Sequence, residues 1–152
     1  MERVTGGCLC GKVRITATGQ PWRVGLCHCM DCRKHHGALF HASAIFPETA
    51  VTVEGETGSY AGRHFCPRCG SPVFSRSGDE VEVHLGTLDE PDRFRPTYEL
   101  WTIRRENWLP EFPLSRRHDR DRDRDRDRDR DRDRDRDRDR DRDRESTERS
   151  EN

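Results

Sequence analysis

The sequence lacks any apolar run approaching the roughly 20 residues of a membrane-spanning helix, so we expect no membrane segment. Its first seven residues, Met-Glu-Arg-Val-Thr-Gly-Gly, lack the apolar stretch of a secretory signal. The formal net charge is only −1 and no basic stripe is present, which argues against a dedicated nucleic-acid binder. We therefore expect a cytoplasmic protein with neither a membrane nor a nucleic acid as its partner.

One segment has an excess of charge of both signs. Residues 119–144 are Asp-Arg repeated 13 times, whereas the 118 residues before them hold 15 Lys+Arg and 14 Asp+Glu. The repeat has no apolar group to bury, so we predict a folded domain over residues 1–115 and a disordered low-complexity tail over residues 116–152. The interleaved aspartates would cancel most of the attraction between the tail's arginines and phosphate, so we favour repeat expansion over RNA or protein contact.

Short alternating segments between glycine-rich turns predict a mostly β domain. The expected strands are 12–17, 39–46, 50–54, 71–75, 80–85 and 97–101. One segment, Met30 to His36, is helical in pattern, for about two turns ending at Gly37. After Trp101 we expect an extended strap over the core, with Trp108 and Phe112 as apolar anchors rather than as ligand-stacking residues.

The seven cysteines fall into three clusters, in the order Cys8-Leu-Cys10, Cys27-His-Cys29-Met-Asp-Cys32 and Cys66-Pro-Arg-Cys69-Gly70. An odd number in a cytoplasmic protein argues against a set of disulfides. The last cluster is a zinc-knuckle sequence, in which the glycine relieves backbone crowding. A thioredoxin-type dithiol needs a helix N-terminus in a βαβ unit, which this β-rich sequence does not offer, so zinc is favoured over redox chemistry.

Seven thiols divide naturally into four and three. The triad Cys27, Cys29 and Cys32 spans six residues and can wrap one ion unaided. Cys8 and Cys10 would then complete a second site with the distant pair Cys66 and Cys69. Four thiolates close a tetrahedral structural zinc, whereas three leave a position open for a substrate.

An open site made only of thiolates favours some reactions over others. Three thiolates donate so much charge that zinc becomes a weak Lewis acid, while a substrate thiolate bound as the fourth ligand stays nucleophilic. Thiol chemistry is therefore favoured over hydrolysis. A base deaminase is excluded, because its His-x-Glu sequence is absent and a proline follows Cys66 where that signature needs one before it.

These clusters, with their flanking residues, resemble the GFA family of glutathione-dependent formaldehyde-activating enzymes, which also includes the centromere protein V domain. The matching segments are Gly-Gly-Cys8-Leu-Cys10-Gly-Lys-Val-Arg14, Cys27-His-Cys29-Met-Asp-Cys32-Arg33 ending in His-Gly37-Ala38, Phe65-Cys66-Pro-Arg-Cys69-Gly70-Ser-Pro-Val-Phe74 and Leu85-Gly-Thr-Leu-Asp89. The resemblance implies an Mss4-like fold of coiled antiparallel sheets and two zinc ions. It also implies that Cys8, Cys10, Cys66 and Cys69 hold a structural zinc, and that Cys27, Cys29 and Cys32 hold a catalytic one.

The resemblance further implies a carbon–sulfur lyase that adds glutathione to formaldehyde, with glutathione or a similar thiol and an aldehyde as its partners. His28 or His35 is a candidate for moving the thiol proton, and Arg33 or Lys34 for holding a substrate carboxylate. A packing or solvated role for these four side chains is the favoured alternative. The competing function is a non-catalytic, zinc-stabilised protein-binding module on the same scaffold.

Overall fold

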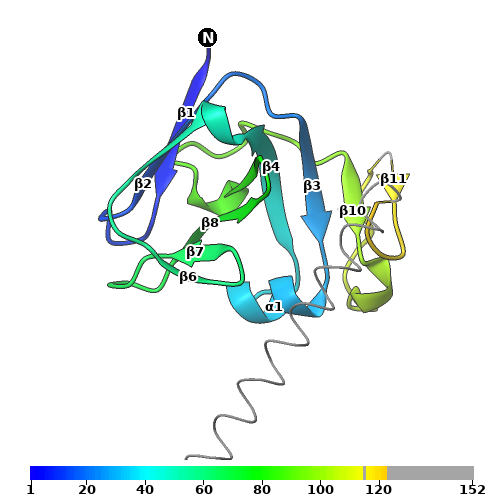
Figure 1. Ribbon diagram of the computed structural model, residues 1–152. Coiled ribbons are helices and arrows are strands. Elements are labelled where there is room, and N and C mark those ends of the chain that lie inside the picture. Colours follow the sequence, from blue (N-terminus) through cyan, green and yellow to red (C-terminus); the bar gives the residue numbers. More distant parts are fainter. Residues whose placement is uncertain (115, 123–152) are drawn as a thin grey trace, which may run out of the picture. The chain divides into compact units, whose positions relative to one another are not determined.

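The computed structural model describes residues 1–114 and 116–122, and Met1–Arg120 form one compact unit (Figure 1). Most of the tail that we predicted to be disordered lies outside the described residues. Within those residues, no helix has the length and apolar character needed to cross a membrane.

The strands are β1 (Arg3–Gly7), β2 (Arg14–Thr18), β3 (Arg23–Cys27), β4 (His41–Pro47), β5 (Val51–Glu54), β6 (Gly58–Tyr60), β7 (Arg63–Phe65), β8 (Pro72–Ser77), β9 (Glu80–His84), β10 (Tyr98–Leu100) and β11 (Arg116–Arg117). The helices are α1 (Met30–His36) and the short 3-10 turns η1 (Glu48–Ala50), η2 (Leu85–Thr87) and η3 (Thr102–Arg104). The expected mostly β fold with one short α-helix is therefore confirmed.

The strands form two sheets. The smaller has the order β1-β2-β5, and the larger has the order β11-β10-β3-β4-β9-β8-β7-β6 (Figure 1). All pairs are antiparallel except β3–β10 and β10–β11, which are parallel. The chain crosses over from β9 to reach β10, so this edge of the sheet departs from the antiparallel arrangement that we expected.

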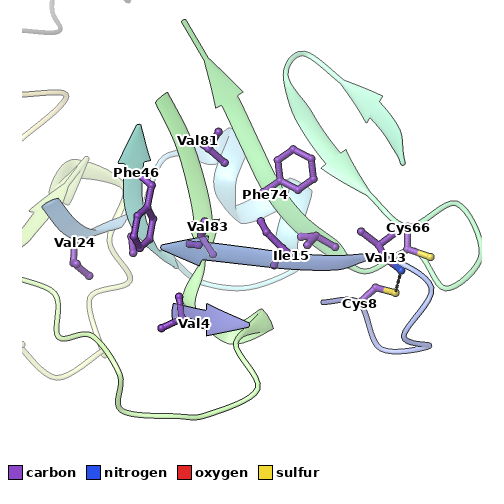
Figure 2. Close-up of a cluster of buried hydrophobic side chains, with 13 residues drawn as sticks. Val4, Cys8, Val13, Ile15, Val24, Phe46, Cys66, Phe74, Val81 and Val83 are labelled. Carbon is purple, nitrogen blue, oxygen red and sulfur yellow. Dashed lines mark hydrogen bonds between the residues drawn. The ribbon is translucent and has the colours of Figure 1, made fainter. Parts of the chain in front are cut away.

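The core is built from the apolar faces of both sheets (Figure 2). On β2 the apolar and polar residues alternate as the sequence indicates. Ile15 and Ala17, with Val13 just before the strand, are buried on one face. Val81 and Val83 of β9 do the same in the larger sheet. Figure 2 also shows the sulfur atoms of Cys8 and Cys66 at one end of this core.

All six predicted strands are present, each shifted by at most two residues at either end, and α1 matches the predicted helix. Sequence reasoning missed β1, β3, β6, β7 and the two-residue β11. Of the two expected strap anchors, Phe112 packs edge-on against Phe40 with ring centroids 5.3 Å apart. The expectation for Trp108 was wrong, since its side chain is 70% exposed. The β11 strand extends the larger sheet past residue 115, and the division into domain and tail stays a prediction.

Candidate metal and active sites

Cys8, Cys10, Cys66 and Cys69 form a cluster between the two sheets. Their sulfur atoms all lie within 4.8 Å of one another, and the Cys8–Cys10 and Cys10–Cys66 sulfur separations are 3.6 and 3.7 Å. A tetrahedral zinc with Zn–S bonds of about 2.3 Å places its sulfur ligands roughly 3.8 Å apart. The cluster therefore fits a four-thiolate metal ion.

Local hydrogen bonds shape both halves of this cluster. In the turn between β7 and β8, the Gly70 amide donates to the carbonyl of Cys66 at 2.8 Å. Gly70 has φ of 76°, a left-handed conformation that a glycine adopts without strain. In the other half, the Val13 amide donates to the Cys8 sulfur at 3.2 Å. A hydrogen bond with the Ser71 hydroxyl and two backbone hydrogen bonds lower the pKa of Cys69 to about 5, which favours a thiolate.

The second cluster contains Cys27, Cys29 and Cys32, whose sulfur atoms also lie within 4.8 Å of one another. Cys27 ends β3, and Cys32 lies in the first turn of α1. Cys29 caps the helix, because its sulfur accepts the Cys32 amide hydrogen at 3.3 Å. A strand end followed directly by a helix start thus brings three thiols together within six residues.

The three thiols share their negative charge unequally. Hydrogen bonds from Cys27 and Cys32 lower the pKa of Cys29 to about 2, and the positive charge of Arg63 acts in the same direction. The pKa of Cys27 is raised well above its usual value by its two thiol neighbours and by burial. These shifts favour a thiolate at Cys29, and a metal ion bound at this site would displace protons from the other two thiols.

His28, between two cysteines of the triad, is fully buried. Its Nε2 lies 2.5 Å from Oε1 of Glu99 on β10. Two arginines also approach this carboxylate, with Nε of Arg105 at 3.2 Å from Oε1 and Nε of Arg117 at 3.6 Å from Oε2. His28 is thus held in a network around the Glu99 carboxylate, and its side chain is not exposed to solvent.

The other sequence candidates differ in accessibility. Arg33 donates to the carbonyl of Arg104 at 2.7 Å and pairs with Glu106 at 2.5 Å, which favours the packing role. Lys34 is exposed. His35 is half-buried on α1, one turn after Cys32, and its Nε2 is buried without a hydrogen-bond partner in the described part of the chain.

Sequence reasoning missed Glu99 and Arg63. Glu99 sits in a three-residue strand, and nothing in the local pattern indicates that its side chain is buried. Arg63 is 31 residues from Cys32 in sequence and comes near the triad only through the pairing of β7 in the larger sheet. Neither position could be found without the long-range contacts of the fold.

The fold and the two cysteine clusters define a small, mostly β protein with sites suited to metal ions. Residues 3–104 match the family described as glutathione-dependent formaldehyde-activating enzyme (GFA), and the chain belongs to this family. Membership supports a GFA-type function.

Two further likenesses are more distant. An uncharacterized lyase of Schizosaccharomyces pombe is 28% identical over 79 residues, which are 49% of this chain and 58% of that protein. The match thus spans little more than half the length of this curated relative. A crystal structure of a Rhodobacter sphaeroides protein has a TM-score of 0.47 at 20% identity, covering 59% of this chain and 91% of that one.

Proposed function

We propose that the chain is a zinc-dependent carbon–sulfur lyase-type enzyme that adds glutathione, or a similar small thiol, to formaldehyde or another small aldehyde. The observation that carries the proposal is a three-cysteine cluster held apart from a four-cysteine cluster in a GFA-family chain. In this proposal Cys8, Cys10, Cys66 and Cys69 hold a structural zinc, and Cys27, Cys29 and Cys32 hold the catalytic zinc. Four thiolates complete a tetrahedral ion, whereas three leave one position open.

When bound, zinc at the triad supplies that open position and keeps a substrate thiol deprotonated and electron-rich. The reaction forms one S–C bond and opens the carbonyl π bond of the aldehyde. The proton of the thiol ends on the former carbonyl oxygen, so the product is a hemithioacetal and no oxidant is needed.

Within this proposal His35 moves the proton. Burial, followed by the positive charge of Arg63, lowers the pKa of His35, so its imidazole is neutral at pH 7 and can accept a proton. Its position one helical turn from Cys32 places it on the same side of α1 as the triad. His28 instead holds the ligand loop in place through Glu99.

The test measures the rate at which zinc-loaded protein forms the adduct of glutathione and ¹³C-formaldehyde, followed by exchange NMR. We expect Cys29→Ala to remove the catalysed exchange while the protein stays folded. Met30→Ala is the matched control, because this residue lies on the same helix and is 43% exposed. Replacing glutathione with 2-mercaptoethanol separates a general thiol activity from one that recognises the peptide.

Native mass spectrometry of the same samples gives a second result. We expect the cysteine clusters of each wild-type chain to hold two zinc ions, together with a glutathione adduct that is lost in Cys32→Ala. Catalysed exchange that persists in Cys29→Ala would refute the assignment of the triad. Two zinc ions without any adduct or exchange would refute the activity and favour the protein-binding module.

A further inference from the structure

A third group of metal-ligand side chains lies outside both cysteine clusters. His36 ends α1, His41 begins β4 and His84 ends β9, and one ring nitrogen of each lies within 4.8 Å of the others. His41 faces Cys27 in the β3–β4 ladder, so this histidine cluster lies beside the cysteine triad. His36 ends the segment that carries the triad, just before Gly37, whereas His41 and His84 belong to none of the cysteine motifs.

The three imidazole rings are packed against one another. The rings of His36 and His41 are stacked, with centroids 4.4 Å apart and planes at 7°. The ring of His84 meets both edge-on, at 4.6 Å from His36 and 4.8 Å from His41. Rings this close cannot all be protonated, because like charges at such distances repel strongly in a buried setting.

Burial favours neutral rings with available lone pairs at His36 and His84. His41 and His84 are only 7% and 4% exposed. Burial lowers the pKa of His36 to about 3, and burial together with the neighbouring imidazoles holds the pKa of His84 well below its usual value. Nδ1 of His84 is buried and has no hydrogen-bond partner within the described residues, which is costly for a polar atom unless something binds it.

Polar groups flank the rings, as they do around histidine ligands in metal sites. Oε2 of Glu82 lies 3.6 Å from Nε2 of His41, and the hydroxyl of Ser75 lies 3.4 Å from Nε2 of His84. In metal sites a carboxylate or a hydroxyl commonly holds the ring through its non-ligating nitrogen. Two of the three rings therefore already have an orienting partner.

We propose that His36, His41 and His84 form a third metal site, which binds a divalent first-row transition ion such as zinc or cobalt. Three imidazoles match the ligand preference of these ions and leave coordination positions open for water. An ion with only nitrogen ligands is a stronger Lewis acid than one held by three thiolates, so this site has a chemistry distinct from that of the triad. The proposal does not depend on the thiol-adding activity.

The test is a cobalt titration of the full-length chain whose cysteine clusters are already filled with zinc. We expect one further Co²⁺ per chain, with the weak visible bands of a nitrogen and oxygen site and without sulfur-to-cobalt charge transfer. His36→Asn is the first variant, because His36 is half-buried and its replacement is tolerated better than that of the two buried rings. We expect it to weaken cobalt binding at least tenfold, whereas the matched control His118→Asn binds as the wild type does.

Two more measurements keep the outcome decisive. Glu82→Gln removes an orienting carboxylate without touching a ligand and should weaken binding roughly tenfold. The imidazole ¹⁵N shifts of the wild-type protein should move at His36, His41 and His84 on adding Zn²⁺, which needs no variant. Absence of a third ion at micromolar cobalt, or equal binding by His36→Asn, would overturn the proposal. Strong charge-transfer bands would instead show that cobalt had entered a cysteine cluster, and would also overturn it.

Discussion

Glu99 shows how one side chain outside the cysteine motifs can hold their backbone in place. Its carboxylate is 1% exposed and receives His28 and two arginines, Arg105 and Arg117. A buried carboxylate is tolerated only when such partners surround it. The network connects β10 to the loop between β3 and α1, so the geometry of the triad depends on a residue 67 positions after Cys32.

We expect Glu99→Ala to lower the free energy of unfolding by roughly 3 kcal/mol, because it leaves buried donors without an acceptor. Urea unfolding followed by circular dichroism measures this change. Glu111→Ala is the control, since Glu111 also pairs with Arg117 but is 79% exposed, and its loss should cost less than about 1 kcal/mol. Equal effects of the two variants would show that the Glu99 network does not stabilise the fold.

At the scale of single elements, the end of α1 depends on the conformation of one glycine. Gly37 caps the helix at φ of 58°, and a Cβ added there would meet no atom within 4 Å. The cost of a side chain at this position is therefore purely conformational.

Gly37→Ala should accordingly lower the free energy of unfolding by about 1 kcal/mol. Gly86→Ala is the matched control, because a Cβ at Gly86 also meets open space but the residue has no positive φ. Thermal unfolding of the two zinc-loaded variants gives the comparison. A destabilised Gly86→Ala, or an unchanged Gly37→Ala, would contradict this account of the helix end.

The parallel pairing of β10 with β3 depends on a close approach. Gly25 of β3 faces Tyr98 of β10, and a Cβ on Gly25 would lie 2.3 Å from two atoms of the tyrosine ring. Only a glycine leaves room for the ring in this register.

A double-mutant cycle tests this contact. We expect Gly25→Ala to cost about 1–3 kcal/mol in the wild-type background and much less in the Tyr98→Ala background, because the clash is then gone. Urea midpoints of the four proteins measure the coupling. Additive effects of the two substitutions would mean that the ring does not require the glycine.

The elements that sequence reasoning found are those whose own residues specify them. β2 and β9 alternate apolar and polar residues, and α1 ends at a glycine, so a local pattern suffices. β3 reads Arg-Val-Gly-Leu-Cys and is buried at its three central positions, so it lacks the alternation of a half-exposed strand. β6 and β7 have three residues each, too few for a period to appear.

In the candidate site, too, local sequence predicted some features, whereas others depend on long-range contacts. Cysteine spacing predicted which thiols lie together, because the triad is contiguous and the other four remain as two pairs. Glu99, Arg63 and the histidine cluster depend on strand register across the larger sheet, which the spacing of residues does not encode. The sequence alone therefore predicts the two thiol clusters but not the groups that surround them.

At the scale of the whole molecule, the four-cysteine cluster links the two sheets. Cys8 and Cys10 follow β1 of the smaller sheet, whereas Cys66 and Cys69 lie between β7 and β8 of the larger one. A metal ion bound here would cross-link two segments that are far apart in the sequence and belong to different sheets. The triad, in contrast, lies within one contiguous segment.

Removal of the two metals should therefore have unequal effects. Structural zinc sites contribute about 10–16 kcal/mol in small domains, which matches or exceeds the roughly 5–15 kcal/mol total stability of a domain. We expect Cys69→Ser to leave the chain largely unfolded at 25 °C and Cys29→Ala to remain folded with one zinc fewer. Circular dichroism combined with zinc analysis checks both, and equal loss of structure in the two variants would contradict the assignment of a structural and an open site.

The spacing of the cysteines also sets an order of events while the chain is being made. The triad is complete once residue 32 has left the ribosome, whereas the other cluster must wait for Cys69. Synthesis proceeds from the N-terminus at about 5–20 residues per second. The three-cysteine cluster therefore has its full set of thiols seconds before the four-cysteine cluster does. When metal ions are scarce, the triad of a nascent chain would thus be able to bind an ion before the four-cysteine cluster that stabilises the fold is complete.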